Sequence, residues 1–342
     1  MSVLPWIDWD EAERVAIRML SPGPKASRQQ RDQLVRQLRS QTIRATGIIT
    51  RASGLPVAGD VGELVVDRRN IVRANVNAFR HIFNQLGAEP DGPLSAAGGY
   101  LRGSAIGPAL ALIGSRVLGQ YDAFGPSPAL YLVAPSIMAV ERQLKVNPTD
   151  FRMWVVLHEQ THRVQFANAP WLRDHLIGQM HELVADTDEP FWRDIGERLE
   201  QIRRDRADGR PTSLRVVNAL SSPTTVAAMD QVSAAMSLLE GHADVMMDRA
   251  GREVIPTVTT IRARFEARRA RRGIFALINK LLGMDAKLAQ YADGARFCRH
   301  VIGVGGTELL NRAFEGPQNL PNLAELLHPQ QWCDRMLADG QA

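Results

Sequence analysis

Cysteines, aromatic residues and long apolar runs are all scarce in this chain of 342 residues. Its two cysteines, Cys298 and Cys333, cannot form a disulfide framework, and neither belongs to the Cys-x-x-Cys pairs that hold many structural zinc ions. The first residues lack the basic and apolar regions of a signal peptide. The most apolar stretches, residues 105–114 and 129–140, each contain a proline and are too short to span a bilayer. We therefore expect a cytoplasmic protein with no membrane span.

A strong excess of charge of either sign is also missing. Charged residues make up 23% of the chain and hydrophobic residues 45%, and the net charge is +4, as in ordinary soluble proteins. The one strongly basic run, residues 262–272, sets six arginines against the single acid Glu266. Neither a known nucleic-acid module nor a regular interleaving of aromatic residues accompanies this run. We therefore interpret it as a solvated helix face and expect no nucleic-acid partner.

Apolar residues recur mostly at helical spacing, which predicts a mainly α fold with little strand. The expected helices span residues 7–20, 28–50, 67–86, 101–118, 147–168, 171–185, 190–204, 226–248, 261–282 and 285–301. We expect one large domain over residues 1–342. Within it, a loop rich in glycine and proline at 87–99 separates an N-terminal helical subregion, 1–90, from a catalytic region, 100–342.

Two segments in the first half of the chain bear on packing. In residues 101–118, the small residues Gly103, Gly107 and Ala111 lie at helical spacing and would let a second helix approach closely. Residues 129–133 are the clearest strand. Two interpretations of this strand stay open. It is either an edge strand that lines a substrate cleft and pairs with an extended peptide, or a short buried strand with no ligand.

The chain is organised around an H-E-x-x-H sequence formed by His158, Glu159 and His162. It lies in a predicted helix over residues 147–168, where Asn147 can cap the first turn. Positions 158 and 162 are one turn apart, so both imidazoles project from one face and can bind one tetrahedral zinc ion. Glu159 points away from that pair, which suits it to hold the water of the metal and to accept its proton.

The alternative is a pair of ordinary histidines on an amphipathic helix. Phe151, Trp154 and Val155 precede His158 on its face, so the two histidines continue an apolar stripe that should point inward. Burial disfavours a charged imidazole and leaves its nitrogens to be satisfied. A zinc ion accounts for such a buried pair, and we therefore predict a zinc site at this helix.

A catalytic zinc ion usually has three protein ligands, and the chain lacks the third histidine of the longer H-E-x-x-H-x-x-G-x-x-H motif. The best source of the third ligand is a predicted helix that carries Glu240, with His242 as the alternative. Asp244 lies one turn after Glu240 and can accept the second ring N–H of either motif histidine. Gly241 and Ala243 are small and would let the two helices approach closely. The competing interpretation is a surface helix with scattered charges.

The order Glu240-x-x-Ala243-Asp244 after H-E-x-x-H is similar to that of gluzincins. More closely, segments across most of the chain resemble an actinobacterial-type family of zinc hydrolases that is associated by context with the biosynthesis of a deazaflavin coenzyme. These segments are RVLGQYD at 116–122, VAPS at 133–136, DFRMWVVLHE at 150–159, QFANAPWLRD at 165–174, LEGHAD at 239–244 and LLGMDAKLAQY at 281–291. The resemblance implies a mainly helical, zincin-like fold and a metal-dependent hydrolase. It implies neither binding nor synthesis of the coenzyme.

Tyr291 lies in the last of these segments and is our preferred candidate for stabilising an oxyanion or donating a proton. His181 and His300 are further candidates. No spacing ties either histidine to the metal, so an ordinary core or surface role is the simpler interpretation of both.

These features together predict a zinc-dependent hydrolase, acting as a metallopeptidase on a peptide or protein substrate, with Glu159 as general base. The alternative is a non-enzymatic binding or assembly protein with a structural zinc ion. Such a site would need a fourth protein ligand, for example His242, and would leave no place for water. Glu159 favours the enzyme, because a structural zinc ion has no use for that carboxylate.

Overall fold

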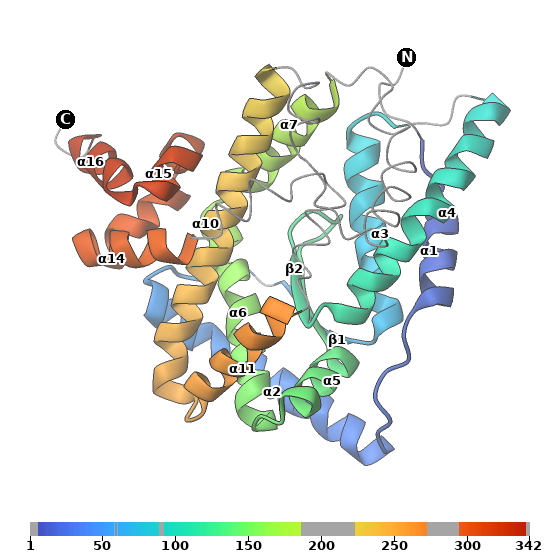
Figure 1. The fold of residues 1–342 in the computed structure, drawn as a ribbon, viewed down its shortest axis with the longest axis horizontal. Coiled ribbons are helices and arrows are strands. Elements are labelled where there is room, and N and C mark those ends of the chain that lie inside the picture. Colours follow the sequence, from blue (N-terminus) through green and yellow to red (C-terminus); the bar gives the residue numbers. More distant parts are fainter. Residues whose placement is uncertain are drawn as a thin grey trace.

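Helices pack against a small three-stranded sheet in this protein (Figure 1). The computed structural model describes residues 6–57, 59, 61–88, 92–185, 223–271 and 294–339. The helices and strands are α1 (Trp9–Met19), α2 (Arg28–Ser53), β1 (Gly62–Val66), α3 (Arg68–Gln85), α4 (Gly92–Arg116), β2 (Gly119–Asp122), β3 (Ala129–Val133), α5 (Ala134–Leu144), α6 (Pro148–Asn168), α7 (Trp171–Ala185), α10 (Pro223–Val254), α11 (Val258–Arg271), α14 (Gly294–Asn311), α15 (Leu323–Leu327) and α16 (Pro329–Asp339). This confirms the predicted mainly helical fold with a small sheet beside the H-E-x-x-H helix. The predicted helix at 190–204 lies outside the described residues, as do residues 272–282 and 285–293 of two other predicted helices.

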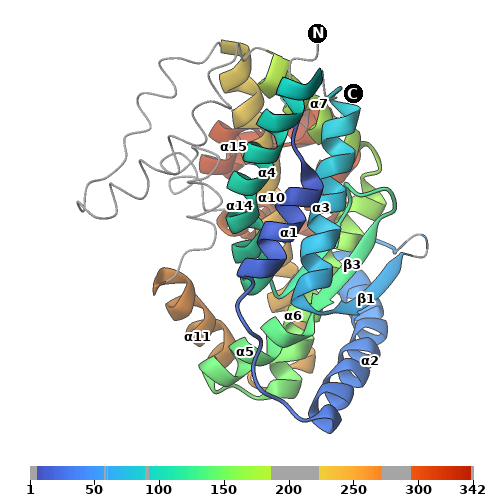
Figure 2. The same ribbon diagram turned by 90° about the vertical axis from the view of Figure 1, so that its right-hand side faces the viewer.

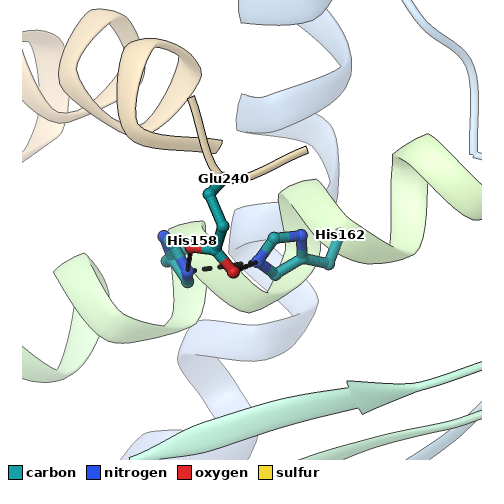
Figure 3. A group of neighbouring side chains, drawn as sticks. All are labelled: His158, His162 and Glu240. Atoms are coloured by element: carbon teal, nitrogen blue, oxygen red, sulfur yellow. Dashed lines mark hydrogen bonds and ion pairs between the residues drawn. The ribbon is translucent and has the colours of Figure 1, made fainter. Parts of the chain in front are cut away.

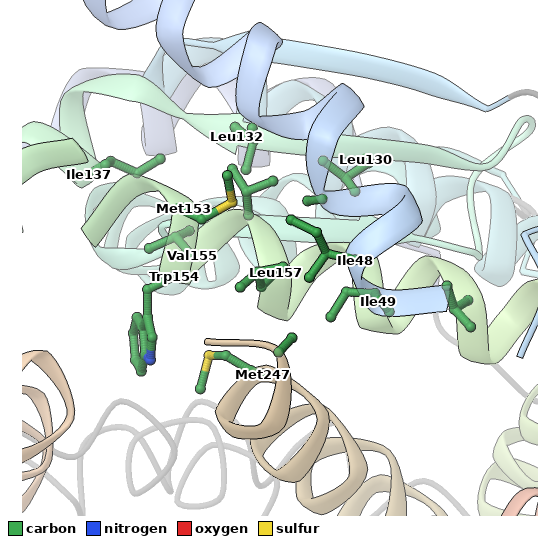
Figure 4. Close-up of a cluster of buried hydrophobic side chains, with 14 of the residues drawn as sticks. Ile48, Ile49, Leu130, Leu132, Ile137, Met153, Trp154, Val155, Leu157 and Met247 are labelled. Atoms are coloured by element: carbon green, nitrogen blue, oxygen red, sulfur yellow. The ribbon is translucent and has the colours of Figure 1, made fainter. Parts of the chain in front are cut away.

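The H-E-x-x-H helix, α6, is the centre of the largest hydrophobic core. Asn147 caps it as predicted, because its side chain accepts the backbone N–H groups of Thr149 and Asp150. The core around α6 draws on α2, β3 and α10, as the side chains of Ile49, Leu130 and Met247 show in Figure 4. Because packing surrounds α6 on several sides, its position relative to the sheet is fixed.

The sheet has the order β1–β3–β2, so β3 is its central strand. β3 runs parallel to β1 and antiparallel to β2. The interpretation of residues 129–133 as an edge strand is therefore wrong, and the alternative of a buried strand is the one observed. Leu130 and Leu132 are fully buried, as expected for a strand with neighbours on both sides. Both edge strands contact α6: Glu63 of β1 pairs with Arg163, and β2 packs against α6 beside Glu159.

A second core joins α1, α3 and α4, which lie side by side in Figure 2. Glycines of α4 face α1 so closely that a Cβ atom at Gly103 would lie 2.2 Å from the carbonyl oxygen of Asp8. At Gly107 it would lie 2.5 Å from Cβ of Val15. The predicted close approach of a second helix is thus confirmed. The residues 92–99, expected as loop, instead form the first turns of α4.

Arg262 and Arg264 of the basic run lie on α11 and make contacts within the protein. Arg262 pairs with Asp248 and Glu266. Arg264 donates to the carbonyl oxygens of Leu144 and Lys145, where α5 ends. These contacts join α11 to α10 and α5. No helix in the described ranges combines the length and the apolar character needed to cross a membrane.

Candidate metal centre

The two histidines of α6 point at a common position. Their Nε2 atoms are 3.1 Å apart. The side chains are 24% exposed for His158 and 14% exposed for His162, so solvent reaches both of them. This pairing follows directly from the spacing of one helical turn.

Glu240 of α10 joins His158 and His162, and we call these three side chains the metal group. One carboxylate oxygen lies 3.7 Å from Nε2 of His158 and the other lies 3.7 Å from Nε2 of His162. In Figure 3 Glu240 reaches from α10 towards the space between the two rings. Among the described residues, these three form the group of side chains whose potential ligand atoms all lie within 4.8 Å of one another.

His242, the alternative third ligand, lies outside this group. Its ring is fully buried and packs edge-on against Phe314, with ring centroids 5.1 Å apart. Burial, and then the nearby charge of His162, lower the pKa of His242 to about 3, so the ring is neutral at physiological pH. Its Nδ1 atom lies 2.9 Å from the side-chain nitrogen of Gln165. His242 therefore contacts Gln165, which in turn contacts His162, and lies outside the group of possible ligands.

The expected role of Gly241 was to bring α10 close to α6, and this is wrong. Gly241 faces α14, where an added Cβ atom would lie 2.0 Å from the carbonyl carbon of Gly294. The close approach of helices therefore occurs on a different side of α10. It holds α10 against α14 while Glu240 faces α6.

Sequence reasoning missed Gln165, which binds His162 directly. Its side-chain oxygen lies 2.9 Å from Nδ1 of His162, and its side-chain nitrogen donates to the carbonyl oxygen of Leu239 at 2.8 Å. Gln165 is fully buried. Its spacing of three residues from His162 on one helix is a signal that could have identified it.

Asp244 was expected to accept the second N–H of one of the two histidines. On His162 that N–H is already engaged by Gln165, so only His158 remains for Asp244. Asp244 is partly buried on α10. Asp244 also lies near the Asp248 carboxyl. Burial raises the pKa of Asp248, and the negative charge of Asp244 raises it further. The contact between Asp244 and His158 stays a prediction.

Of the three weaker candidates, the structure describes only His181 and His300, and it places neither in the group of His158, His162 and Glu240. Tyr291 lies outside the described residues. His181 and His300 are both exposed, on α7 and α14. His300 pairs with Gln330 at 3.0 Å. The simpler interpretation, an ordinary surface role, holds for these two histidines.

Glu159 lies beneath the edge strand β2. Its carboxylate accepts the backbone N–H of Tyr121. Burial, and then the charge of Glu240, raise the pKa of Glu159 well above its ordinary value, while the Tyr121 N–H acts in the opposite direction. A Cβ atom at Gly119 would lie 2.5 Å from Cγ of Glu159, so only glycine leaves room for this side chain. The strand thus holds Glu159 next to the possible ligands, while Glu159 itself is not one of them.

The donor set fits a zinc ion. Two imidazole nitrogens and one carboxylate oxygen form a common ligand set of catalytic zinc. A tetrahedral ion with ordinary bond lengths keeps its ligand atoms about 3.3 Å apart. The two Nε2 atoms are 3.1 Å apart, close to this value, and each lies 3.7 Å from a different oxygen of Glu240. Partial exposure of the group leaves access for water.

A mainly helical fold, an H-E-x-x-H helix and a glutamate from a second helix together define a protein of the zincin type. The chain belongs to the zincin-like metallopeptidase family, whose model matches residues 7–333. Membership of this family implies a metal ion. The group formed by His158, His162 and Glu240 is the candidate site for such an ion.

One solved structure is similar over nearly the whole chain. It is a candidate hydrolase from Chloroflexus aurantiacus, described as having a novel fold, and is 29% identical in sequence. The match covers 96% of this chain and 98% of that protein, with a TM-score of 0.71. No functionally curated protein matches the chain significantly.

Proposed function

We propose that this protein is a zinc-dependent hydrolase that cleaves peptide bonds. His158, His162 and Glu240 would hold the zinc ion, and Glu159 would act as general base. The observation that carries the proposal is the convergence of these ligand atoms, from two helices, beside a buried carboxylate. Membership of the zincin-like metallopeptidase family supports it.

Glu159 has the environment of a proton acceptor. When bound, the zinc ion would polarise the substrate carbonyl and lower the pKa of a water molecule. The Glu159 carboxylate takes the proton of that water and passes it to the leaving amine. The Tyr121 N–H fixes the carboxylate while leaving lone pairs free for the proton. Burial of Glu159 favours its protonated form, which strengthens it as a base.

The edge of β2 suits an extended peptide. The backbone N–H of Val133 donates to the carbonyl oxygen of Leu118, and bonded and non-bonded pairs alternate along an antiparallel ladder. Gly119 and Tyr121 therefore turn their backbone groups away from β3, towards the outer edge. The Tyr121 N–H there donates to Glu159, so a peptide would pair with the backbone groups of Gly119 and the carbonyl oxygen of Tyr121. In the described part of the chain no strand pairs with this edge. We infer that the substrate adds to β2 as a further strand, which places its backbone beside Glu159.

The rival function is a non-enzymatic binding or assembly protein with a structural zinc ion. A structural site needs four protein ligands. Within the described ranges the group has three, and His242 faces Gln165 instead of the group. This geometry favours an open, catalytic site.

Two finer statements belong to the proposal and rest on the sequence. We propose that the chain is of the actinobacterial type associated by context with deazaflavin coenzyme biosynthesis, because the resembling segments extend across most of the chain. We also propose a cytoplasmic location. Neither statement affects the chemistry of the site.

Removal of the metal tests the proposal. Protein purified without chelators should contain about one zinc ion per chain, by the three-ligand rule for catalytic sites. It should cleave members of a peptide library, and a chelator should stop the cleavage until zinc is returned. Metal analysis and mass spectrometry of the cleaved library measure both. Chelator-resistant cleavage, or a protein that takes up no transition metal, would contradict the assignment.

A further inference from the structure

Gln165 has an amide whose orientation can be deduced from its neighbours. It is fully buried between α6 and α10 and has three partners: His162, the carbonyl oxygen of Leu239, and His242. A backbone carbonyl oxygen can only accept a hydrogen bond. The amide nitrogen of Gln165 must therefore face Leu239, at 2.8 Å, and the amide oxygen must face Nδ1 of His162, at 2.9 Å.

This orientation fixes the proton on His162. An amide oxygen is an acceptor only, so Nδ1 of His162 must carry hydrogen. In a neutral imidazole the other nitrogen, Nε2, then has the free lone pair. Nε2 is the atom that lies 3.1 Å from His158 and 3.7 Å from Glu240.

We propose that Gln165 is a positioning residue that holds His162 in the one tautomer able to bind the metal through Nε2. The inference rests on the proposed function only in taking His162 as a ligand. Rotation of the amide by half a turn would place NH₂ against Nδ1 and move the His162 proton to Nε2. The carbonyl oxygen of Leu239 prevents this rotation, because two oxygens would then face each other.

His242 provides a second restraint on the same amide. The second hydrogen of the Gln165 nitrogen points to Nδ1 of His242, which must accept it. The His242 proton is therefore on Nε2, an atom that is buried and has no partner among the described residues. A buried donor without a partner is costly, and the contact with Gln165 offsets part of that cost. The chain His162–Gln165–His242 thus joins the metal group to α10.

Gln165→Leu should lower zinc affinity roughly 10–100-fold, the usual cost of losing an outer partner of a ligating histidine. Gln165→Glu keeps an acceptor for Nδ1 of His162 and should bind zinc more tightly than the leucine variant. Gln160→Leu is the matched control. Gln160 is equally buried on α6, but its amide binds Thr42 and Glu63, away from the metal group. This control should lose thermal stability without losing zinc affinity.

The measurements are zinc titration against a chromophoric chelator and ¹⁵N NMR of histidine-labelled, metal-free protein. In the wild type the His162 proton should be on Nδ1, and in Gln165→Leu it should be shared between the two nitrogens. A wild-type proton on Nε2 overturns the proposal even if no variant folds. So does a folded leucine variant with unchanged zinc affinity and tautomer. Absence of zinc binding by the wild type would defeat the proposed function alone, because the NMR measurement needs no metal.

Discussion

Glu159→Gln should retain zinc and lose peptide hydrolysis. Glutamine keeps the shape of the side chain, and its oxygen can still accept the Tyr121 N–H. It cannot accept the proton of the attacking water, and one general base contributes roughly 10²–10⁴-fold to a rate. The substitution also removes an ionisable group that is buried near Glu240, so the free energy of unfolding should not decrease.

The comparison uses a peptide identified in the library screen, with the metal content and thermal unfolding of both proteins measured in parallel. A structural zinc ion predicts no cleavage by either form. Cleavage at the wild-type rate by the glutamine variant would show that Glu159 is not the base. Loss of zinc together with activity would instead make Glu159 part of the metal binding itself.

Glu240→Ala should lower zinc affinity strongly, because it removes one of three ligands. The loss should exceed the roughly 10–100-fold typical of changes in the groups that surround ligands. His242→Ala should lower affinity less, since Leu239 still orients the Gln165 amide in that variant. Titration with a competing chelator measures the zinc affinity of the wild type and of the two variants.

His242→Ala is also the internal control for damage to α10, because it removes a fully buried side chain close to Glu240. If the histidine variant empties the site and the glutamate variant does not, the assignments of ligand and neighbour must be exchanged. Circular dichroism should show both variants folded before the affinities are compared.

The sequence was sufficient to predict the helix, its cap and the facing histidines because all three depend on local spacing. The close contact of α4 with α1 followed from a local repeat of small residues in the same way. Glu240 was predicted from the chemistry that zinc needs, and its placement beside His158 depends on the packing of α10 on α6. That packing joins segments far apart in the chain.

The errors concern features that local spacing does not determine. Residues 129–133 were identified as a strand, but strand order is set by neighbours, and β2 was too short to be recognised beforehand. Gly241 was assigned to the wrong helix contact, because a small residue does not indicate which helix it faces. Gln165 was overlooked because a buried glutamine gains its role only when Leu239 and His242 of another helix lie next to it.

Gly119 makes one position of the chain useful for recognising active relatives. Any side chain at position 119 would occupy the space of the Glu159 side chain. With the same backbone, a glutamate at 159 is therefore incompatible with a residue larger than glycine at 119. A homologue that keeps H-E-x-x-H but lacks the glycine must either move its strand or displace its base. Glycine at the first residue of β2 can therefore separate, by inspection of a sequence, relatives built for hydrolysis from those that have only the motif.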